Sequence, residues 1–164
     1  MKQSFSMLNN GLISVIIWVK MLFIFGFTIM HAVFILYTGM DIEAGGLSYN
    51  EAQNGRLFAI IGITGIITQG VLIGPLSKRF GPARLLPISC LLCGLGLVLI
   101  PYTQADWAFA YLFAVVILIS VGNGIFQPSS SSLLTTTANQ SGINLRIVMG
   151  AQESVCSFAR IIGP

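Results

Sequence analysis

Charged residues are scarce in this chain. Only 8% of its 164 residues are Asp, Glu, Lys or Arg, while 55% are hydrophobic and the mean hydropathy is +0.88. An average soluble domain is roughly 25% charged. So few charged side chains could not cover a globule of this size without leaving large apolar patches exposed to water. The composition therefore excludes a water-soluble globular domain and predicts an integral membrane protein.

Histidine and cysteine are also rare, with one His and three Cys in the chain. Cys90 and Cys93 form a Cys-x-x-Cys pair inside an apolar run, but no histidine or second pair lies at ligand spacing. We interpret both as small packing residues of a membrane helix. Paired carboxylates, nucleophile triads, phosphate-binding loops and metal clusters are missing from the sequence as well. The sequence predicts no enzyme, no metal site and no cofactor.

Long apolar runs dominate what is present. A bilayer core of about 30 Å needs roughly 20 apolar residues at about 1.5 Å per residue. Runs of this length predict an all-α integral membrane protein with about five transmembrane helices. The helices are expected near residues 18–38, 57–76, 85–101, 107–135 and 147–164.

The charged residues between these runs predict the orientation. Acidic residues gather in the first and third connections: Asp41, Glu43, Glu51 and Asp106. Basic residues gather in the second and fourth: Lys78, Arg79, Arg84 and Arg146. By the positive-inside rule the N-terminus is cytoplasmic, in a multi-pass protein of the cell membrane, or of the inner membrane if the source is bacterial. Basic residues in alternate connections indicate the orientation of the chain in a membrane and do not form a nucleic-acid-binding surface. The predicted partner is therefore the lipid bilayer, and no nucleic acid is expected to bind.

The connection between the second and third runs carries a motif. It resembles the signature loop of the major facilitator superfamily, Gly-x-Leu-x-Asp-Arg-x-Gly-Arg-Lys/Arg-Arg/Lys. The matching positions are Gly74, Leu76, Arg79, Gly81 and Arg84. Three positions depart from the pattern: Lys78 stands where the family usually has Asp, and Pro82 and Ala83 stand where basic residues are usual. Lys78 reverses the sign of the contact by which such a loop latches onto a neighbouring helix end. Taken alone, the segment could also be an ordinary basic turn.

The last apolar run carries a second motif. Exporters of the same family have, in their fifth helix, Gly, eight residues, Gly, three residues and Gly-Pro. The corresponding residues here are Gly150, Ala159, Gly163 and Pro164. Arg160 also resembles the drug-exporter branch. The basic residue that proton-coupled members place four residues before a Gly-x-Gly pair is Leu118 here, so its role does not carry over.

The resemblance implies the architecture and the activity. Family members have twelve helices in two halves and bind substrate between the halves. Residues 1–164 would be an incomplete N-terminal half, inactive alone without the missing C-terminal helices. The expected activity of the whole protein is efflux of a small organic solute or drug by proton antiport. Two alternatives stay open: a solute importer of the same fold, and a small non-transporting scaffold or regulatory membrane protein.

Ionisable residues within a span are costly and are therefore functional candidates. Glu153 and Arg160 lie seven residues apart in the fifth run, which places them about 20° apart on one helix face. Glu153 is the candidate for a cavity carboxylate that takes a proton or a cationic substrate in turn. A purely structural pairing, with each other or with other helices, is the alternative.

Other polar residues in the runs are weaker candidates for a substrate or proton path. They are His31, Gln69, Asn123 and Gln127. Hydrogen bonds between helices would explain each of them about as well. Lys20 is expected near the cytoplasmic end of the first helix, where its long side chain would reach the membrane surface as an anchor.

Overall fold

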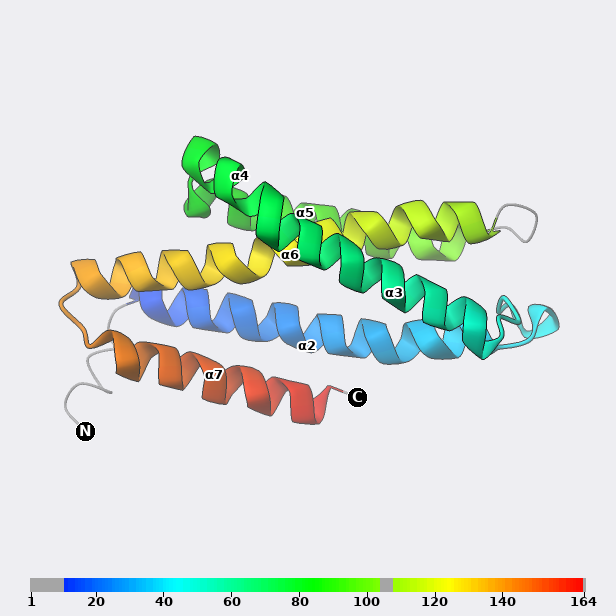
Figure 1. Ribbon diagram of the computed structural model, residues 1–164. Coiled ribbons are helices and arrows are strands. Elements are labelled where there is room, and N and C mark those ends of the chain that lie inside the picture. The colour runs from blue at the N-terminus through cyan, green and yellow to red at the C-terminus, as the bar shows by residue number, and fades with distance from the viewer. Residues whose placement is uncertain (1–10, 104–107, 164) are drawn as a thin grey trace. The chain divides into compact units, whose positions relative to one another are not determined.

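A computed structural model describes residues 11–103 and 108–163 of the chain. Within these ranges all regular secondary structure is helical, so the all-α fold predicted from the sequence is confirmed. The α-helices are α2 (Gly11–Gly39), α3 (Glu51–Ile67), α4 (Ile73–Phe80), α5 (Pro82–Leu99), α6 (Ala108–Gln140) and α7 (Leu145–Ile162) (Figure 1). Short 3-10 helices occupy η1 (Ile42–Ala44) and η3 (Ile100–Tyr102), and a π-helical turn occupies η2 (Thr68–Leu72).

Among the described residues, four helices are long and apolar enough to cross a bilayer. They cover Gly11–Gly39, Glu51–Phe80, Pro82–Tyr102 and Phe109–Gln140. Helix α7 is a continuous helix of 18 residues, but it carries Arg146, Glu153 and Arg160 and is less apolar than the other four. That α7 also spans the membrane remains a prediction.

Helices α3 and α7 begin before the predicted apolar runs, and a polar residue caps each of them. Helix α3 begins at Glu51 rather than near Leu57, since Asn50 and Gln53 form a capping box. The Asn50 side chain accepts from the Gln53 N–H, and the Gln53 side chain accepts from the Asn50 N–H, both at 2.9 Å. Asn144 caps α7 by accepting from the Arg146 N–H at 3.0 Å. The length of an apolar run does not reveal these polar first turns of the helices.

The segment predicted as the cytoplasmic signature loop is mostly helical, which corrects the prediction. Helix α4 continues to Phe80, and α5 begins at Pro82, so Gly81 alone makes the turn. Gly81 has φ +74°, a conformation that glycine adopts without steric cost. Pro82 takes the first helical position, where a missing N–H costs nothing. Lys78 and Arg79 lie in the last turn of α4, where positive charge suits the helix dipole.

The described chain forms two compact units, and α2 and α6 each contribute to both. The first unit contains residues 11–33 and 130–163. Here α7, orange to red in Figure 1, packs along the N-terminal part of α2 and the C-terminal part of α6. One core cluster contains Ile13, Ile16, Leu134, Ala138 and Val148. A second contains Ile24, Cys156 and Ala159.

The second unit, residues 34–129, is held by close contacts at the glycines of α6. A Cβ atom on Gly122 would lie 2.6 Å from the Cys93 Sγ and 3.0 Å from the Ser89 carbonyl oxygen of α5. A Cβ atom on Gly124 would lie 2.8 Å from the Thr68 methyl group of η2. Small residues let helix backbones approach closely, which is a main source of association between membrane helices. These glycines therefore determine how α6 meets its neighbours in this unit.

We predict that Gly122→Ala destabilises the second unit, by about 1–3 kcal/mol, because the added methyl group overpacks the contact with α5. Gly94→Ala is the matched control, since a Cβ atom there meets nothing within 4 Å. Alanine favours helix over glycine at both positions, so the control should be neutral or slightly stabilising. Unfolding by SDS in mixed micelles, followed by circular dichroism, measures both. Equal stability of the two variants would refute close packing at Gly122.

Candidate functional site

A lysine is buried between three helices of the first unit. Lys20 lies on α2 with only 4% of its side chain exposed. Its Nζ atom is 3.8 Å from a carboxylate oxygen of Glu153 on α7 and donates a hydrogen bond of 3.2 Å to the Ser131 hydroxyl on α6. Removing an ammonium group from water is costly unless the group is paired and hydrogen-bonded. These two contacts are what allow the lysine to occupy this position.

The partner carboxylate is far more accessible than the lysine. The Glu153 side chain is 57% exposed, and its Oε1 atom also accepts a hydrogen bond of 3.1 Å from the Gln152 amide. Gln152 is fully buried, and its own Oε1 atom has no hydrogen-bond partner in the described part of the chain. We call Lys20, Ser131, Gln152 and Glu153 the polar cluster. Of its two charged groups, the carboxylate is the more exposed one.

The predicted role of Lys20 as a surface anchor is wrong. Helix α2 begins by Gly11, well before the predicted start near Trp18, so Lys20 lies more than two turns inside the helix. Its neighbours Ile13, Ile16 and Ile24 are all buried. The residue that looked like a helix-end cation therefore belongs to the core.

Glu153 and Arg160 both lie on α7, as predicted, but the ion pair that the structure gives Glu153 is with Lys20. Arg160 is exposed, in the last turn of the helix. The sequence did not predict the contributions of Ser131 and Gln152. Their only signal was polarity within or beside an apolar run, which many hydrogen-bonded helix residues share.

The C-terminal part of the fifth-helix motif faces α2. Ala159 is buried in the cluster with Ile24. A Cβ atom on Gly163 would lie 3.1 Å from the Thr28 Cβ atom, so glycine permits close approach there. Gly150 is exposed with open space around it. Pro164 lies outside the described residues.

His31 is half-buried on α2. Its Nδ1 atom lies 3.0 Å from the Phe27 carbonyl oxygen, one turn earlier in the same helix. Its ring meets the Phe27 ring edge to face, with 4.4 Å between the centroids. These contacts describe local packing within one helix, and a role for His31 in proton transfer stays a prediction.

Three further candidates lie in the second unit. Gln69 is exposed, in the π-helical turn η2. Asn123 is half-buried on α6, and its Oδ1 atom has no hydrogen-bond partner among the described residues. Gln127 is half-buried one turn further along α6. The polar path that these residues were predicted to line remains a prediction.

The comparison with known families agrees with the two motifs and the helical architecture. The sequence profile of the Major Facilitator Superfamily matches residues 3–164. The chain belongs to the major facilitator superfamily. This family comprises membrane transporters, so the chain is part of a multi-pass transporter family and not of an enzyme family. No solved structure matches the chain at a significant level.

Two curated relatives are similar over part of their length. The tetracycline resistance protein, class G, of Vibrio anguillarum is 29% identical over 116 residues, which are 71% of this chain and 28% of the relative. Dipeptide and tripeptide permease A of Erwinia pyrifoliae is 35% identical over 92 residues, which are 55% of this chain and 18% of the relative. The matched regions thus span less than a third of the length of either relative.

We predict that the charges of Lys20 and Glu153 are energetically coupled. Glu153→Gln leaves the buried ammonium with Ser131 as its polar neighbour and should destabilise the chain by about 1–3 kcal/mol. This loss is smaller than that expected on breaking a fully buried ion pair, because the carboxylate is half exposed. Adding Lys20→Met removes the buried charge and should restore much of that loss. Unfolding in mixed micelles measures the double-mutant cycle, with Arg160→Gln as the exposed control. Strictly additive effects would show that the pair is not coupled.

Proposed function

We propose that the chain is the N-terminal part of a secondary transporter of the cell membrane that exports a small organic solute or drug in exchange for protons. Glu153 is the proton-carrying carboxylate in this proposal. The polar cluster is the observation that supports this proposal. A carboxylate that is largely exposed, beside a buried lysine, is suited to bind and release a proton or a solute. The similarity to a tetracycline resistance protein supports export, since removal of a drug from the cell confers resistance.

The geometry of the polar cluster suggests how a proton could be coupled to a structural change. Ionised Glu153 offsets the charge of Lys20, which is 3.8 Å away. Protonation of Glu153 would leave the ammonium group buried with only the Ser131 hydroxyl and neutral neighbours, an arrangement that costs free energy. The contact between α2 and α7 is therefore favoured in one protonation state over the other. Such a difference is what a two-state transporter needs to link proton binding to rearrangement.

Solute import by the same fold is the second candidate. It is favoured by the similarity to a dipeptide and tripeptide permease, which is 35% identical over 92 residues. The two candidates share the proton-carrying carboxylate but differ in the direction of coupling. In antiport, protons and solute move in opposite directions, whereas in symport they move together.

We predict that, in proteoliposomes holding the complete transporter, an acidic lumen drives accumulation of labelled tetracycline. The sign of this response does not depend on which way the protein is inserted, because the proton gradient alone sets the direction of exchange. Labelled dialanine is the parallel probe. Accumulation of either solute only when the outside is acidic would overturn export and establish symport.

Glu153→Gln should reduce this gradient-driven accumulation at least tenfold, because glutamine cannot carry a proton. Glu43→Gln is the matched control, since Glu43 is exposed in η1, outside the polar cluster. Its accumulation should equal that of the unmodified protein. Undiminished accumulation by the Glu153 variant would contradict the role given to this carboxylate.

The predicted orientation is testable by cysteine labelling in intact cells. With the three native cysteines replaced by alanine, Glu43→Cys should react with a membrane-impermeant maleimide from outside the cell. Gln140→Cys, an exposed position at the end of α6, should react only after the membrane is permeabilised. The opposite pattern would place the N-terminus outside.

A further inference from the structure

The turn between α4 and α5 concentrates positive charge. Lys78 and Arg79 lie in the last turn of α4, Gly81 makes the turn, and Arg84 lies in the first turn of α5. All three basic residues are exposed. We call Lys78, Arg79 and Arg84 the basic turn.

The basic turn lies at the surface of the bilayer. It joins the segments Glu51–Phe80 and Pro82–Tyr102, each of which is long and apolar enough to span a membrane. A turn between two consecutive spans falls at the boundary between membrane and water, on whichever side of the membrane it lies. The three cations are therefore at the level of the lipid headgroups, and this placement does not depend on the predicted orientation.

The described carboxylates of the second unit lie at its other end. Asp41 and Glu43 belong to the connection between α2 and α3, and Glu51 begins α3. At about 1.5 Å per residue, the helical segment that begins at Glu51 puts roughly 40 Å between this residue and the end of α4. Glu153, in the first unit, is paired with Lys20.

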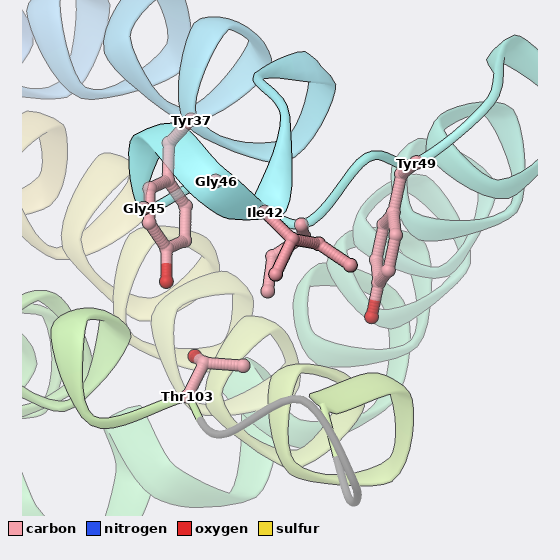
Figure 2. A pocket seen from close by; sticks show the side chains of 7 residues that line it. Tyr37, Ile42, Gly45, Gly46, Tyr49 and Thr103 are labelled. Atoms are coloured by element: carbon pink, nitrogen blue, oxygen red, sulfur yellow. The ribbon is translucent and has the colours of Figure 1, made fainter.

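Helix α5 also leads away from the basic turn to the acidic end of the second unit. Thr103, which follows η3, lines a cavity together with Ile42 and Tyr49 of the α2–α3 connection (Figure 2). Asp106 lies outside the described residues. Within the described part of the chain, no carboxylate forms an ion pair with a residue of the basic turn.

The charges of the basic turn are therefore poorly compensated by the chain itself. Lys78 stands where the family's signature loop usually supplies an acid. Arg84 lies in the first turn of a helix, where positive charge is unfavourable. Three cations around one tight turn also repel one another. An anion from outside the chain would relieve each of these costs.

Exposed apolar side chains lie beside these charges. The Phe80 ring ends α4 with 44% of the residue exposed, and the Arg79 guanidinium lies 5.6 Å from its centroid. Val71 and Leu72, earlier in the same helical segment, are exposed as well. A free phosphate ion gains nothing from such a surface. A phospholipid places acyl chains directly beneath its phosphate, so it can use the cations and the apolar surface together.

We propose that the basic turn binds the headgroup of an anionic phospholipid, with the acyl chains against Val71, Leu72 and Phe80. Arg79 and Arg84 can each donate two parallel N–H groups to phosphate oxygens, and Lys78 adds a third positive charge. A zwitterionic lipid offers the same phosphate, but its own ammonium group is repelled by the remaining cations. This inference concerns a partner of the membrane surface and holds for export and for import alike.

The test is native mass spectrometry of the 164-residue chain in detergent micelles, titrated with phosphatidylglycerol and separately with phosphatidylcholine. We expect adducts of phosphatidylglycerol to form at a concentration roughly tenfold lower. The triple variant Lys78→Gln, Arg79→Gln, Arg84→Gln should weaken phosphatidylglycerol binding on the order of tenfold, because each cation near the surface contributes a few-fold. The three single variants should each weaken it roughly two- to fivefold.

The matched control removes the same number of charges elsewhere. It is the triple variant Arg56→Gln, Arg146→Gln, Arg160→Gln, whose positions are exposed and lie outside the basic turn. Its affinity for phosphatidylglycerol should stay within about twofold of that of the unmodified chain, and circular dichroism checks that both triple variants keep their helices. Equal losses in the two triple variants would show attraction by net charge alone and would overturn the proposal. Equal affinity of the unmodified chain for the two lipids would do the same.

Inorganic phosphate separates a lipid site from a site for soluble anions. Added at the same concentration as the lipid, it should leave the phosphatidylglycerol adducts unchanged, because it cannot contact the apolar surface beside Phe80. If inorganic phosphate displaced the lipid, the basic turn would be a site for soluble anions, and the assignment to a lipid headgroup would be wrong.

Discussion

The helices of this chain satisfy one constraint: in a bilayer core there is no water to pair with backbone N–H and C=O groups. Among the described residues, four helices are long and apolar enough to span a bilayer. In a helix the backbone N–H and C=O groups are hydrogen-bonded to one another, so these helices meet the constraint. Between α4 and α5 the chain turns at a single residue, Gly81. Side-chain packing then has to hold the helices together without much help from the hydrophobic effect. The contacts at Gly122 and Gly124, where only a hydrogen atom fits, follow directly from that limitation.

The polar cluster is the place where the chain departs from apolar packing. Lys20 could have been replaced by an apolar residue at lower energetic cost, since buried ion pairs seldom stabilise more than well-packed hydrophobic side chains of similar size. Its retention among Ile13, Ile16 and Ile24 therefore points to a use for the charge. Arg160, in contrast, is exposed in the last turn of α7.

Apolar run length was sufficient to predict the helices, because the bilayer dictates both their length and their composition. It was insufficient to predict their ends, because the residues that begin α3 and α7 are polar caps such as Asn50 and Asn144. The predicted start of α2 was also too late, and this had a consequence for the site: with α2 starting near Trp18, Lys20 looked like a surface anchor. Glu153 was recognised as a candidate from its place in an apolar helix. Its partners Lys20 and Ser131 lie on other helices, and only the tertiary fold brings them together.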